Sequence, residues 1–367
     1  MATKYYSLKK ILEKDAQYNI IFGERSNGKT YAALEYGLER YIKYGEQFAI
    51  VRRWAEDIIG KRGSVMFDSL CCNGLGENVV KKLSKGKWNA VYYYSSRWYL
   101  CNINNETREK IVDDTPFAYG FAITSGEHDK STSYPRITTV IFDEFLTRTA
   151  YAPDEFVLFM NVLSTIIRDR KNVKIFMLGN TVSQYSPYFK EMGLKHIKEM
   201  KQGDIDVYTY GNSELRVAVE YANPTSKGKS SDVYFAFDNP KLQMITTGVW
   251  EIDIYPHCPF KYRPSDVVYN FFIKFDTEIL QCEVVSANDC IFGFIHRKTT
   301  PIKEVEYEII YTQEYDERPN YRRKINKPVT KLEKKIYELF VTDKIFYSDN
   351  DVGEIVRNYL MWCGVKL

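Results

Sequence analysis

The stretch that most constrains this chain is residues 23–30, which read GERSNGKT. They match the phosphate-binding pattern G-x-x-x-x-G-K-[ST] at every fixed position. The apolar run at residues 18–22 predicts a short buried strand before the stretch, and the apolar spacing from Ala32 to Ile42 predicts a helix after it. Because the pattern binds phosphate in the order strand, glycine loop and helix, these neighbours make an ordinary glycine turn the weaker interpretation.

The chemistry of this loop follows from its residue types. The glycines let the backbone approach phosphates closely, with N–H groups pointing inward at a helix N-terminus. Lys29 is expected to reach the β- and γ-phosphates of ATP, and the Thr30 hydroxyl is expected to hold Mg²⁺. The predicted ATP-binding residues of the loop are Gly23, Glu24, Arg25, Ser26, Asn27, Gly28, Lys29 and Thr30.

A second informative stretch is residues 138–145, where consecutive apolar residues run into Asp143 and Glu144. A strand buried on both faces has this composition, and open α/β sheets bind ligands at the carboxyl ends of such strands. Asp143 is therefore the candidate for the Mg²⁺ shell, and Glu144 for the base that orients and polarises the attacking water. Two solvated acids at a strand end are the alternative, but together with the glycine loop the pair favours hydrolysis over a kinase or a passive nucleotide binder.

Polar residues also lie before and after the strand predicted at residues 173–178, which follows a helical pattern at 156–167. Asn180 comes at the end of this strand and is a candidate sensor of the γ-phosphate, although a plain turn residue is an equally good interpretation. Arg168 and Arg170 precede the strand and could supply a charge-stabilising finger to the nucleotide of a neighbouring subunit. Spacing alone favours the alternative, a solvated helix end stabilised by the helix dipole.

The composition limits the class of protein. With 367 residues, the chain is long enough for two domains with a sizeable core. Its hydrophobic content of 44% is typical of a globular protein, and its net charge of +3 gives no overall attraction to nucleic acid. A basic run at residues 318–335 is the best local candidate for contact with a phosphate backbone, although most such runs are solvated surfaces. Seven cysteines without paired spacing suit a reducing compartment, and the short apolar runs predict no membrane span.

Changes of pattern along the chain divide it into three parts. Residues 1–200 carry the nucleotide motifs and an expected antiparallel hairpin at 89–103. Residues 201–245 become richer in Gly, Ser, Asn and Lys and are expected to form a linker segment or small linker domain. Residues 246–367 are expected to form a β-rich domain. Its predicted elements are strands at 249–254, 267–275, 279–285 and 290–295, and helices at 331–340 and 352–362.

The placement of these motifs resembles a known family, the DNA encapsidation ATPases of small tailed phages with protein-primed linear genomes (Picovirinae). The similar segments are residues 41–48 and 51–53, Lys130-Ser131, Tyr134-Pro135, residues 140–145 and residues 168–170. They cover the first half of the chain, and the resemblance is weak beyond residue 200. It implies an α/β fold, a P-loop NTPase core of the ASCE type with a mostly parallel sheet. We expect the linker and a smaller β-rich, RNase H-like C-terminal domain to follow this core.

The resemblance also implies a function, partners and a location. Members of the family are homomeric ring motors on the phage portal that use ATP to drive double-stranded DNA into a prohead. Lys29, Glu144 and Arg168 are then the expected catalytic residues, with Arg168 acting in trans, and Lys130 is expected to bind ATP across a subunit interface. The implied partners are double-stranded DNA, the portal (connector) protein, other copies of this chain in a ring expected to be a pentamer and, left open, a packaging RNA. Such a motor is expected in the host cytoplasm, transiently at the portal vertex of the prohead and not in the mature virion.

Two other functions stay open at this point. Related terminases carry a C-terminal nuclease with metal-binding carboxylates, so a packaging ATPase that also cleaves DNA is the main alternative. Asp253, Asp276 and Glu278 lie on or near predicted strands, but their spacing defines no metal site. We therefore expect a vestigial domain that contacts nucleic acid or the portal without cutting. The third function is a P-loop regulator that binds nucleotide as a switch, and the adjacent acids Asp143 and Glu144 argue against it.

Overall fold

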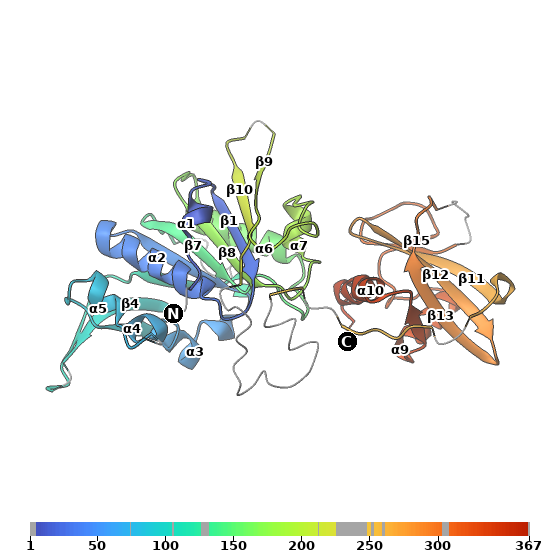
Figure 1. Cartoon of the computed structure of the whole chain (residues 1–367), viewed down its shortest axis with the longest axis horizontal. Helices are drawn as coiled ribbons and strands as arrows, with labels where there is room; N and C mark the ends of the chain where they lie inside the picture. Colours follow the sequence, from blue (N-terminus) through green and yellow to red (C-terminus); the bar gives the residue numbers. More distant parts are fainter. Residues whose placement is uncertain are drawn as a thin grey trace. The chain divides into compact units, whose positions relative to one another are not determined.

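The computed structural model forms two compact units, whose chain paths are shown in Figure 1. The first unit comprises Met1–Thr147 and Ala152–Trp250, and the second comprises Arg148–Tyr151 and Glu251–Leu367. The structure describes residues 5–73, 75–104, 106–125, 132–211, 213–224, 248–250, 253–258, 261–302 and 308–365.

The first unit is built on a large, mostly parallel sheet. Among the described residues this sheet has ten strands, in the order β3-β4-β6-β2-β7-β8-β1-β10-β9, with β5 beside β4. The six strands from β6 to β10 in this order run parallel, and the hairpin strands at one edge and β9 at the other are antiparallel. The strands are β1 (Tyr18–Gly23), β2 (Gln47–Arg52), β3 (Ala90–Tyr94), β4 (Arg97–Ile103), β5 (Lys110–Val112), β6 (Ala118–Ala122), β7 (Ile137–Asp143), β8 (Lys174–Asn180), β9 (Ile205–Thr209) and β10 (Arg216–Tyr221).

Helices cover both faces of this sheet, because its central strands are apolar on both sides. Neighbouring residues of a strand point to opposite faces. On one face, Ile141 of β7 belongs to the same buried cluster as Leu34 and Leu38 of helix α2 (Lys29–Tyr44). On the other face, the ring of Phe142 lies 4.7 Å from that of Phe159, which belongs to helix α6 (Glu155–Ile167). The ring of Tyr188 in the short helix α7 (Pro187–Glu191) lies 5.5 Å from Phe142 on this same face.

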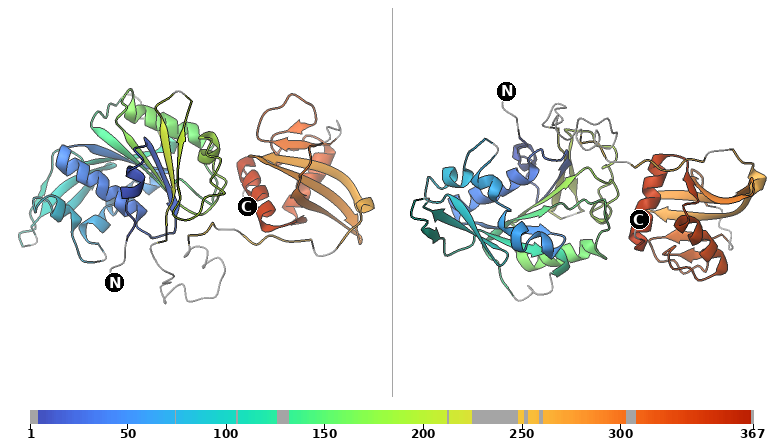
Figure 2. Two further views of the ribbon diagram at one scale, coloured as in Figure 1. Left: turned by 45° about the horizontal axis from the view of Figure 1, so that its top comes forward. Right: turned by 90° about the horizontal axis from the view of Figure 1, so that it is seen from below.

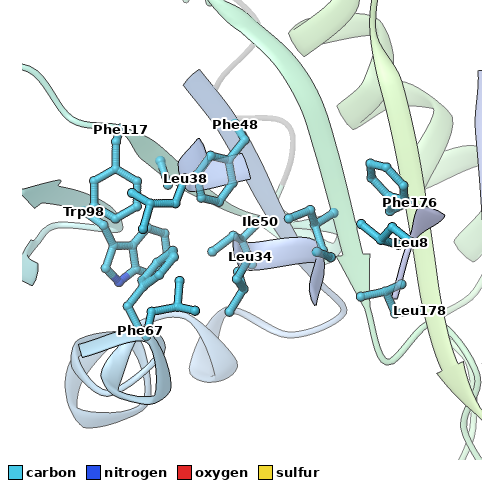
Figure 3. Close-up of a cluster of buried hydrophobic side chains, with 14 of the residues drawn as sticks. Leu8, Leu34, Leu38, Phe48, Ile50, Phe67, Trp98, Phe117, Phe176 and Leu178 are labelled. Atoms are coloured by element: carbon cyan, nitrogen blue, oxygen red, sulfur yellow. The ribbon is translucent and has the colours of Figure 1, made fainter. Parts of the chain in front are cut away.

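The largest buried cluster joins the parallel sheet to the hairpin at its edge. Phe67 lies at the centre of an aromatic group, 4.9 Å from Phe117 and 5.5 Å from Trp98 between ring centroids (Figure 3). Trp98 is fully buried and donates its indole hydrogen to the Gly63 carbonyl at 2.8 Å. Burial of each such aromatic side chain contributes about 1.5–3 kcal/mol. This cluster lies beneath three short helices that the sequence analysis does not predict, α3 (Gly60–Ser64), α4 (Asp68–Cys71) and α5 (Val79–Leu83).

Several elements of the first unit confirm the sequence predictions. The strand expected before the glycine loop is β1 and the helix expected after it is α2, and the strands expected at 138–145 and 173–178 are β7 and β8. The hairpin expected at 89–103 is the antiparallel pair of β3 and β4. A short helix, α1 (Lys9–Leu12), precedes β1.

The linker expected at residues 201–245 is wrong for its first part. Residues 205–221 contribute β9 and β10 to the first sheet, and β10 pairs with β1 in parallel. The physical reason is burial: Val217, Ala218 and Val219 are all fully buried against the central strands. Composition averaged over the segment hid this short apolar run. Residues 225–247, which include the rest of the expected linker, lie outside the described residues.

The second unit is a mixed sheet with helices in the C-terminal part of the chain (Figure 2). Its described strands follow the order β15-β14-β11-β12-β13-β16. The long strands β11 to β13 form an antiparallel meander, and β14 and β15 continue the sheet in parallel on one side, as β16 does on the other. The elements are β11 (Val267–Phe275), β12 (Glu278–Ala287), β13 (Cys290–Arg297), β14 (Ile310–Thr312), β15 (Tyr321–Arg322), α9 (Lys331–Val341), β16 (Ile345–Tyr347) and α10 (Asn350–Cys363).

The predicted meander and both predicted helices are confirmed here, since β11, β12, β13, α9 and α10 lie at the expected positions. The strand expected at 249–254 is wrong wherever the structure describes that segment, which has no strand there. Ile254 shows the reason, because its side chain is 77% exposed and has no buried face to fill. In the described parts of the chain, no helix combines the length and the apolar character needed to cross a membrane.

Candidate functional site

The candidate site lies where three parallel strands end side by side. In the strand register, Gly23 of β1 pairs with Asn180 of β8, and Asp143 of β7 pairs with Leu178 of β8. Because the strands are parallel, their carboxyl ends meet at one edge, which is where open α/β sheets bind ligands. A cavity of about 340 Å³ opens at this edge. Its lining residues are Arg25, Ser26, Asn27, Gly28, Lys29, Thr30, Tyr31, Asp143, Glu144, Leu178, Gly179 and Asn180.

The loop has the backbone shape that close approach to a phosphate requires. Gly28, the residue before helix α2, has a φ of 93°, a left-handed conformation that glycine adopts without a steric penalty. Ser26 has a φ of 58°, so a second residue of the loop is held in a less populated conformation. The loop therefore ends at a helix N-terminus whose N–H groups are available to an anion.

Lys29 is a buried cation of this cavity and is held by neutral oxygens. Its Nζ donates to the carbonyls of Glu24 at 2.6 Å and Gly23 at 3.3 Å, and to the side-chain oxygens of Asn27 at 3.1 Å and Asn180 at 3.4 Å. Burial lowers the pKa of Lys29 to about 8, and the nearby charges of Asp143 and Glu24 oppose this shift. An anionic ligand would favour the charged form of the lysine. Asn180, predicted from its place after a strand, is thus brought into the site.

Thr30 and Asp143 bring the two sequence motifs together. The Thr30 hydroxyl donates to Asp143 Oδ1 at 3.0 Å. Burial raises the pKa of the Asp143 carboxyl, and the Arg52 guanidinium opposes this rise, as do Thr30 and Lys29. A hydroxyl and a carboxylate are the hard oxygen ligands that Mg²⁺ prefers. A buried carboxylate with a raised pKa also gains most from a nearby cation, so these residues fit the predicted Mg²⁺.

Arg52 is the site residue that the sequence analysis did not assign. It lies at the end of β2, the neighbour of β7, and its two terminal nitrogens reach Asp143 at 2.9 Å and Glu144 at 2.7 Å. Its Nε is buried without a hydrogen-bond partner among the described residues. The Glu144 side chain is 64% exposed, and its φ of 61° turns the chain sharply after the strand. The sequence contains an indication of this role, because Arg52 is a charged residue at the end of a buried strand of the same parallel sheet.

Arg53 and Glu155 fix the backbone behind the two acids. Arg53 is buried and donates to Glu155 at 2.8 Å and to the carbonyls of Phe145 at 2.8 Å and Glu144 at 3.3 Å. Glu155 in turn accepts a hydrogen bond of 2.8 Å from Tyr188. Such a fully bonded buried network holds Glu144 in place through its own carbonyl. Glu155 therefore has a positioning role that no motif indicated.

The structure separates the two arginines that follow α6. Arg170 donates to the carbonyls of five residues, Tyr134, Pro135, Ile137, Ile166 and Ile167, which makes it a structural anchor. Arg168 is exposed and donates to the Thr132 carbonyl at 3.1 Å. Its backbone has φ 52° and ψ −128°, an unusual conformation for a residue with a side chain. Lys130 lies outside the described residues.

The three acids noted in the second unit are not brought together. Asp253 accepts from Arg148 at 2.5 Å, Asp276 occupies a turn with a φ of 56°, and Glu278 lies 3.9 Å from Arg297. Within the described ranges, no group of three or more His, Cys, Asp or Glu side chains could hold a metal ion. The structure thus offers no support for the nuclease alternative.

The basic run at residues 318–335 is only partly available to a ligand. Arg318 pairs with Asp316 at 2.7 Å, and Arg322 pairs with Glu333 at 2.9 Å. Besides Arg318, the exposed members are Arg323, Lys327, Lys331, Lys334 and Lys335, and the last three lie on α9. Any contact of this run with a phosphate backbone would come from these side chains.

Comparison with known proteins connects this geometry to a family. The model of the Podovirus DNA encapsidation protein (Gp16) family matches residues 2–86 and 94–255. The chain belongs to this family. Its match includes the glycine loop, the acids at the end of β7 and both arginines after α6, so the resemblance found in the first half of the sequence is confirmed.

Individual relatives agree with the family assignment. The DNA packaging protein of Bacillus phage phi29 is 29% identical over 188 residues, which cover 50% of this chain and 49% of the relative. That of Bacillus phage B103 is 28% identical over 187 residues, with 50% of each chain covered. The chain therefore spans about half the length of the curated relatives it matches.

Two solved structures share the fold over nearly the whole chain. The Phi-28 gp11 DNA packaging motor superposes with a TM-score of 0.55 at 17% identity and covers 100% of both chains. The bacteriophage Phi-29 viral genome packaging motor assembly gives 0.53 at 19% identity, with 96% of both chains covered. At these identities the likeness concerns the fold alone.

Proposed function

We propose that this protein is an ATP-hydrolysing motor that moves double-stranded viral DNA into a prohead. The observation that carries the proposal is the hydrogen bond between Thr30 and Asp143, which joins the two nucleotide motifs in one cavity of a DNA encapsidation family member. β8 lies between the strands that carry these motifs, the additional strand expected for an ASCE-type P-loop core. This arrangement suits hydrolysis of the phosphoanhydride bond between the β- and γ-phosphates of ATP, at the carboxyl ends of the strands.

The roles of the cavity residues follow from their chemistry. The loop N–H groups and Lys29 bind the phosphates of ATP, and the lysine gains charge as the anion enters. Thr30 and Asp143 would hold Mg²⁺, which when bound neutralises phosphate charge. Asn180, which is hydrogen-bonded to Lys29, would contact the γ-phosphate. These residues position the substrate, which is the main requirement of phosphoryl transfer.

Glu144 would orient the attacking water and accept its proton. In the present arrangement Arg52 is bonded to this carboxylate at 2.7 Å, and an ion-paired carboxylate is a weaker base. Glu144 must therefore exchange Arg52 for water before hydrolysis. Its exposed side chain permits this exchange, and the bonds from Arg53 to the Glu144 and Phe145 carbonyls keep the backbone in place meanwhile.

Arg168 can serve a nucleotide only in another subunit. Asp143 lies at the carboxyl end of β7. Arg168 precedes the amino end of the parallel strand β8, and therefore lies at the opposite end of these strands. A strand such as β8 spans about 20 Å, which is farther than an arginine side chain reaches. A finger that acts in trans requires a head-to-tail interface that closes into a ring. The exposed side chain and unusual backbone of Arg168 suit this role.

The remaining proposals concern partners and the second unit. Double-stranded DNA, the portal protein and a homomeric ring are proposed as partners, and a cytoplasmic motor that docks transiently on the prohead is the proposed setting. For the second unit we propose an RNase H-like domain without nuclease activity. The support is its sheet, in which three antiparallel strands are continued by two parallel ones beside β11. The exposed lysines of α9 are its candidate contacts with nucleic acid.

The test is ATP hydrolysis with and without double-stranded DNA over a salt series. A motor that tracks the DNA backbone should be stimulated by DNA at low salt, and the stimulation should fade as counterions compete. The same assay with proheads that carry the portal controls for assembly of the ring. If the rate of hydrolysis is independent of DNA both with and without proheads, the proposal of a DNA motor is wrong. If no ATP is hydrolysed under either condition, the proposal of an ATPase is wrong.

A further inference from the structure

A pair of stacked tyrosines lies at the glycine loop and has no part in the roles assigned so far. Tyr31 directly follows Thr30 in helix α2, and its ring stacks on that of Tyr5 with centroids 6.3 Å apart and an angle of 26° between the planes. This geometry is typical of offset aromatic stacking. Tyr5 is 49% exposed, so part of an aromatic surface remains open to a ligand.

The chain before β1 is fastened to the loop, which sets the position of Tyr5. The Tyr6 N–H donates to the Asn27 carbonyl at 3.0 Å, and the Tyr6 hydroxyl donates to Glu220 of β10 at 2.6 Å. The Tyr5 ring also covers Gly28, because a Cβ at that glycine would lie 3.3 Å from the ring. An exposed aromatic side chain with its backbone tied to the phosphate loop is preorganised for a ligand held by that loop.

The roles assigned so far in the cavity account for the phosphates and the metal ion of a nucleotide, but not for its base. Its lining is polar around Lys29, Thr30 and Asp143, which suits phosphates and a metal ion. Among the described residues that line it, Tyr31 is the one aromatic side chain. Successive helical residues project about 100° apart, so Tyr31 faces a different side of the loop from Thr30 and its partner Asp143. Burial raises the pKa of the Tyr31 hydroxyl, and a hydrogen bond between this hydroxyl and Asn73 opposes the rise.

We propose that Tyr5 and Tyr31 form the stacking surface for the nucleobase, so that the segment before β1 belongs to the nucleotide site. A purine offers a flat π-face to such a pair, and stacking of a base on an aromatic side chain is sequence-tolerant and favourable. The inference rests on the proposed function, because it takes the phosphates to be bound by the loop. It assigns binding of the base to residues that no phosphate motif contains.

The test compares a ligand that has a base with one that has none. Binding of MgATP and of inorganic tripolyphosphate with Mg²⁺ is measured by calorimetry on the full chain and on Tyr5→Ala. The variant should bind ATP about tenfold more weakly, because one stacking contact is lost, and should bind tripolyphosphate within twofold of wild type. Tyr5→Phe, which keeps the ring, should retain the base-dependent affinity.

Two further variants separate stacking from packing. Tyr5→Leu keeps an apolar side chain over Gly28 without a π-face and should lose ATP affinity as Tyr5→Ala does. Tyr44→Ala removes an exposed tyrosine at the far end of α2 and should change neither ligand. Equal weakening of both ligands in Tyr5→Ala, or full ATP affinity in Tyr5→Leu, would overturn the proposal. Failure of the wild type to bind tripolyphosphate and ATP would instead count against the proposed nucleotide function.

Discussion

The candidate site of the first unit and the Glu333–Arg322 pair of the second unit hold buried charge in different ways. In the first unit, Lys29 is held by carbonyl and amide oxygens, and one guanidinium, that of Arg52, serves both Asp143 and Glu144. In the second unit, the buried carboxylate of Glu333 is paired with Arg322 at 2.9 Å.

The difference has a physical meaning. A cation bonded to neutral oxygens can turn to a phosphate without breaking an ion pair, and two acids that share one arginine can accept a metal ion or a water molecule. Charges in completed pairs already have their partners and mainly hold a structure together. At the candidate site of the first unit, Lys29 and Asp143, whose pKa values are shifted by burial, lie near Glu144, whose φ is 61°.

Glu144→Gln should give the largest effect on function. Removal of the proposed base is expected to slow hydrolysis by as much as about ten-thousand-fold, while ATP binding is kept because the loop is intact. The measurement is single-turnover hydrolysis together with nucleotide affinity. Glu283→Gln, which changes an acid paired with His296 in the second unit, is the matched control and should hydrolyse ATP normally. Normal turnover in Glu144→Gln would remove this residue from its role.

Arg168→Ala comes next, with an expected loss of about a thousandfold in turnover, the low end for an arginine finger. Since Arg168 lies at the sheet edge away from its own cavity, mixing this variant with Lys29→Ala should restore activity. Rescue arises at interfaces where an intact Arg168 faces an intact cavity. Absence of rescue at every ratio, with mixed rings verified, would exclude action in trans. Arg170→Ala should instead unfold more easily, because Arg170 holds five backbone carbonyls.

Glu333→Ala tests the structural side of the comparison. Its carboxylate accepts from Arg322 and from the Val329 N–H at 2.6 Å, and its side chain is 1% exposed. Loss of a buried partner should lower the free energy of unfolding of the second unit by about 3 kcal/mol. Glu338→Ala, an exposed change on the same helix, should stay within about 0.5 kcal/mol. Urea unfolding measures both, and ATP affinity should not change in either variant. A stable Glu333→Ala would contradict the paired-charge interpretation.

The smallest expected effect is a proton that accompanies nucleotide binding. Lys29 has a pKa lowered to about 8, and a bound phosphate raises it again, so about half a proton should be taken up per nucleotide at pH 8. Burial raises the pKa of Asp143, so Mg²⁺ should expel a proton as the pH falls towards that pKa. Binding enthalpies in buffers of different ionisation enthalpy report both signs.

Omission of Mg²⁺ is the control for this experiment, because it should remove the release and keep the uptake. Uptake that is equally large at pH 6 would contradict the assignment to Lys29, which is already protonated there.

Much of this arrangement was predictable because its signals are local. The glycine loop, the strands β1, β7 and β8 and the meander of the second unit follow from the spacing of apolar and glycine residues. The site residues in residues 23–30 and at Asp143, Glu144 and Asn180 meet in one cavity because parallel strands end at a common edge. One error arose where polar neighbours obscured a short apolar run, Val217 to Val219, and another where a strand was expected around the exposed Ile254.

By itself, the sequence determined which residue types carry the chemistry, since a lysine after a glycine loop and two acids after a buried strand are local patterns. Only the tertiary structure decided that Arg52 joins both acids, that Arg168 lies at the far edge of the sheet and that Tyr5 stacks beside the loop. These relations depend on strand order and on contacts between distant residues. Their free energy comes from packing the whole unit, which no window of the sequence contains.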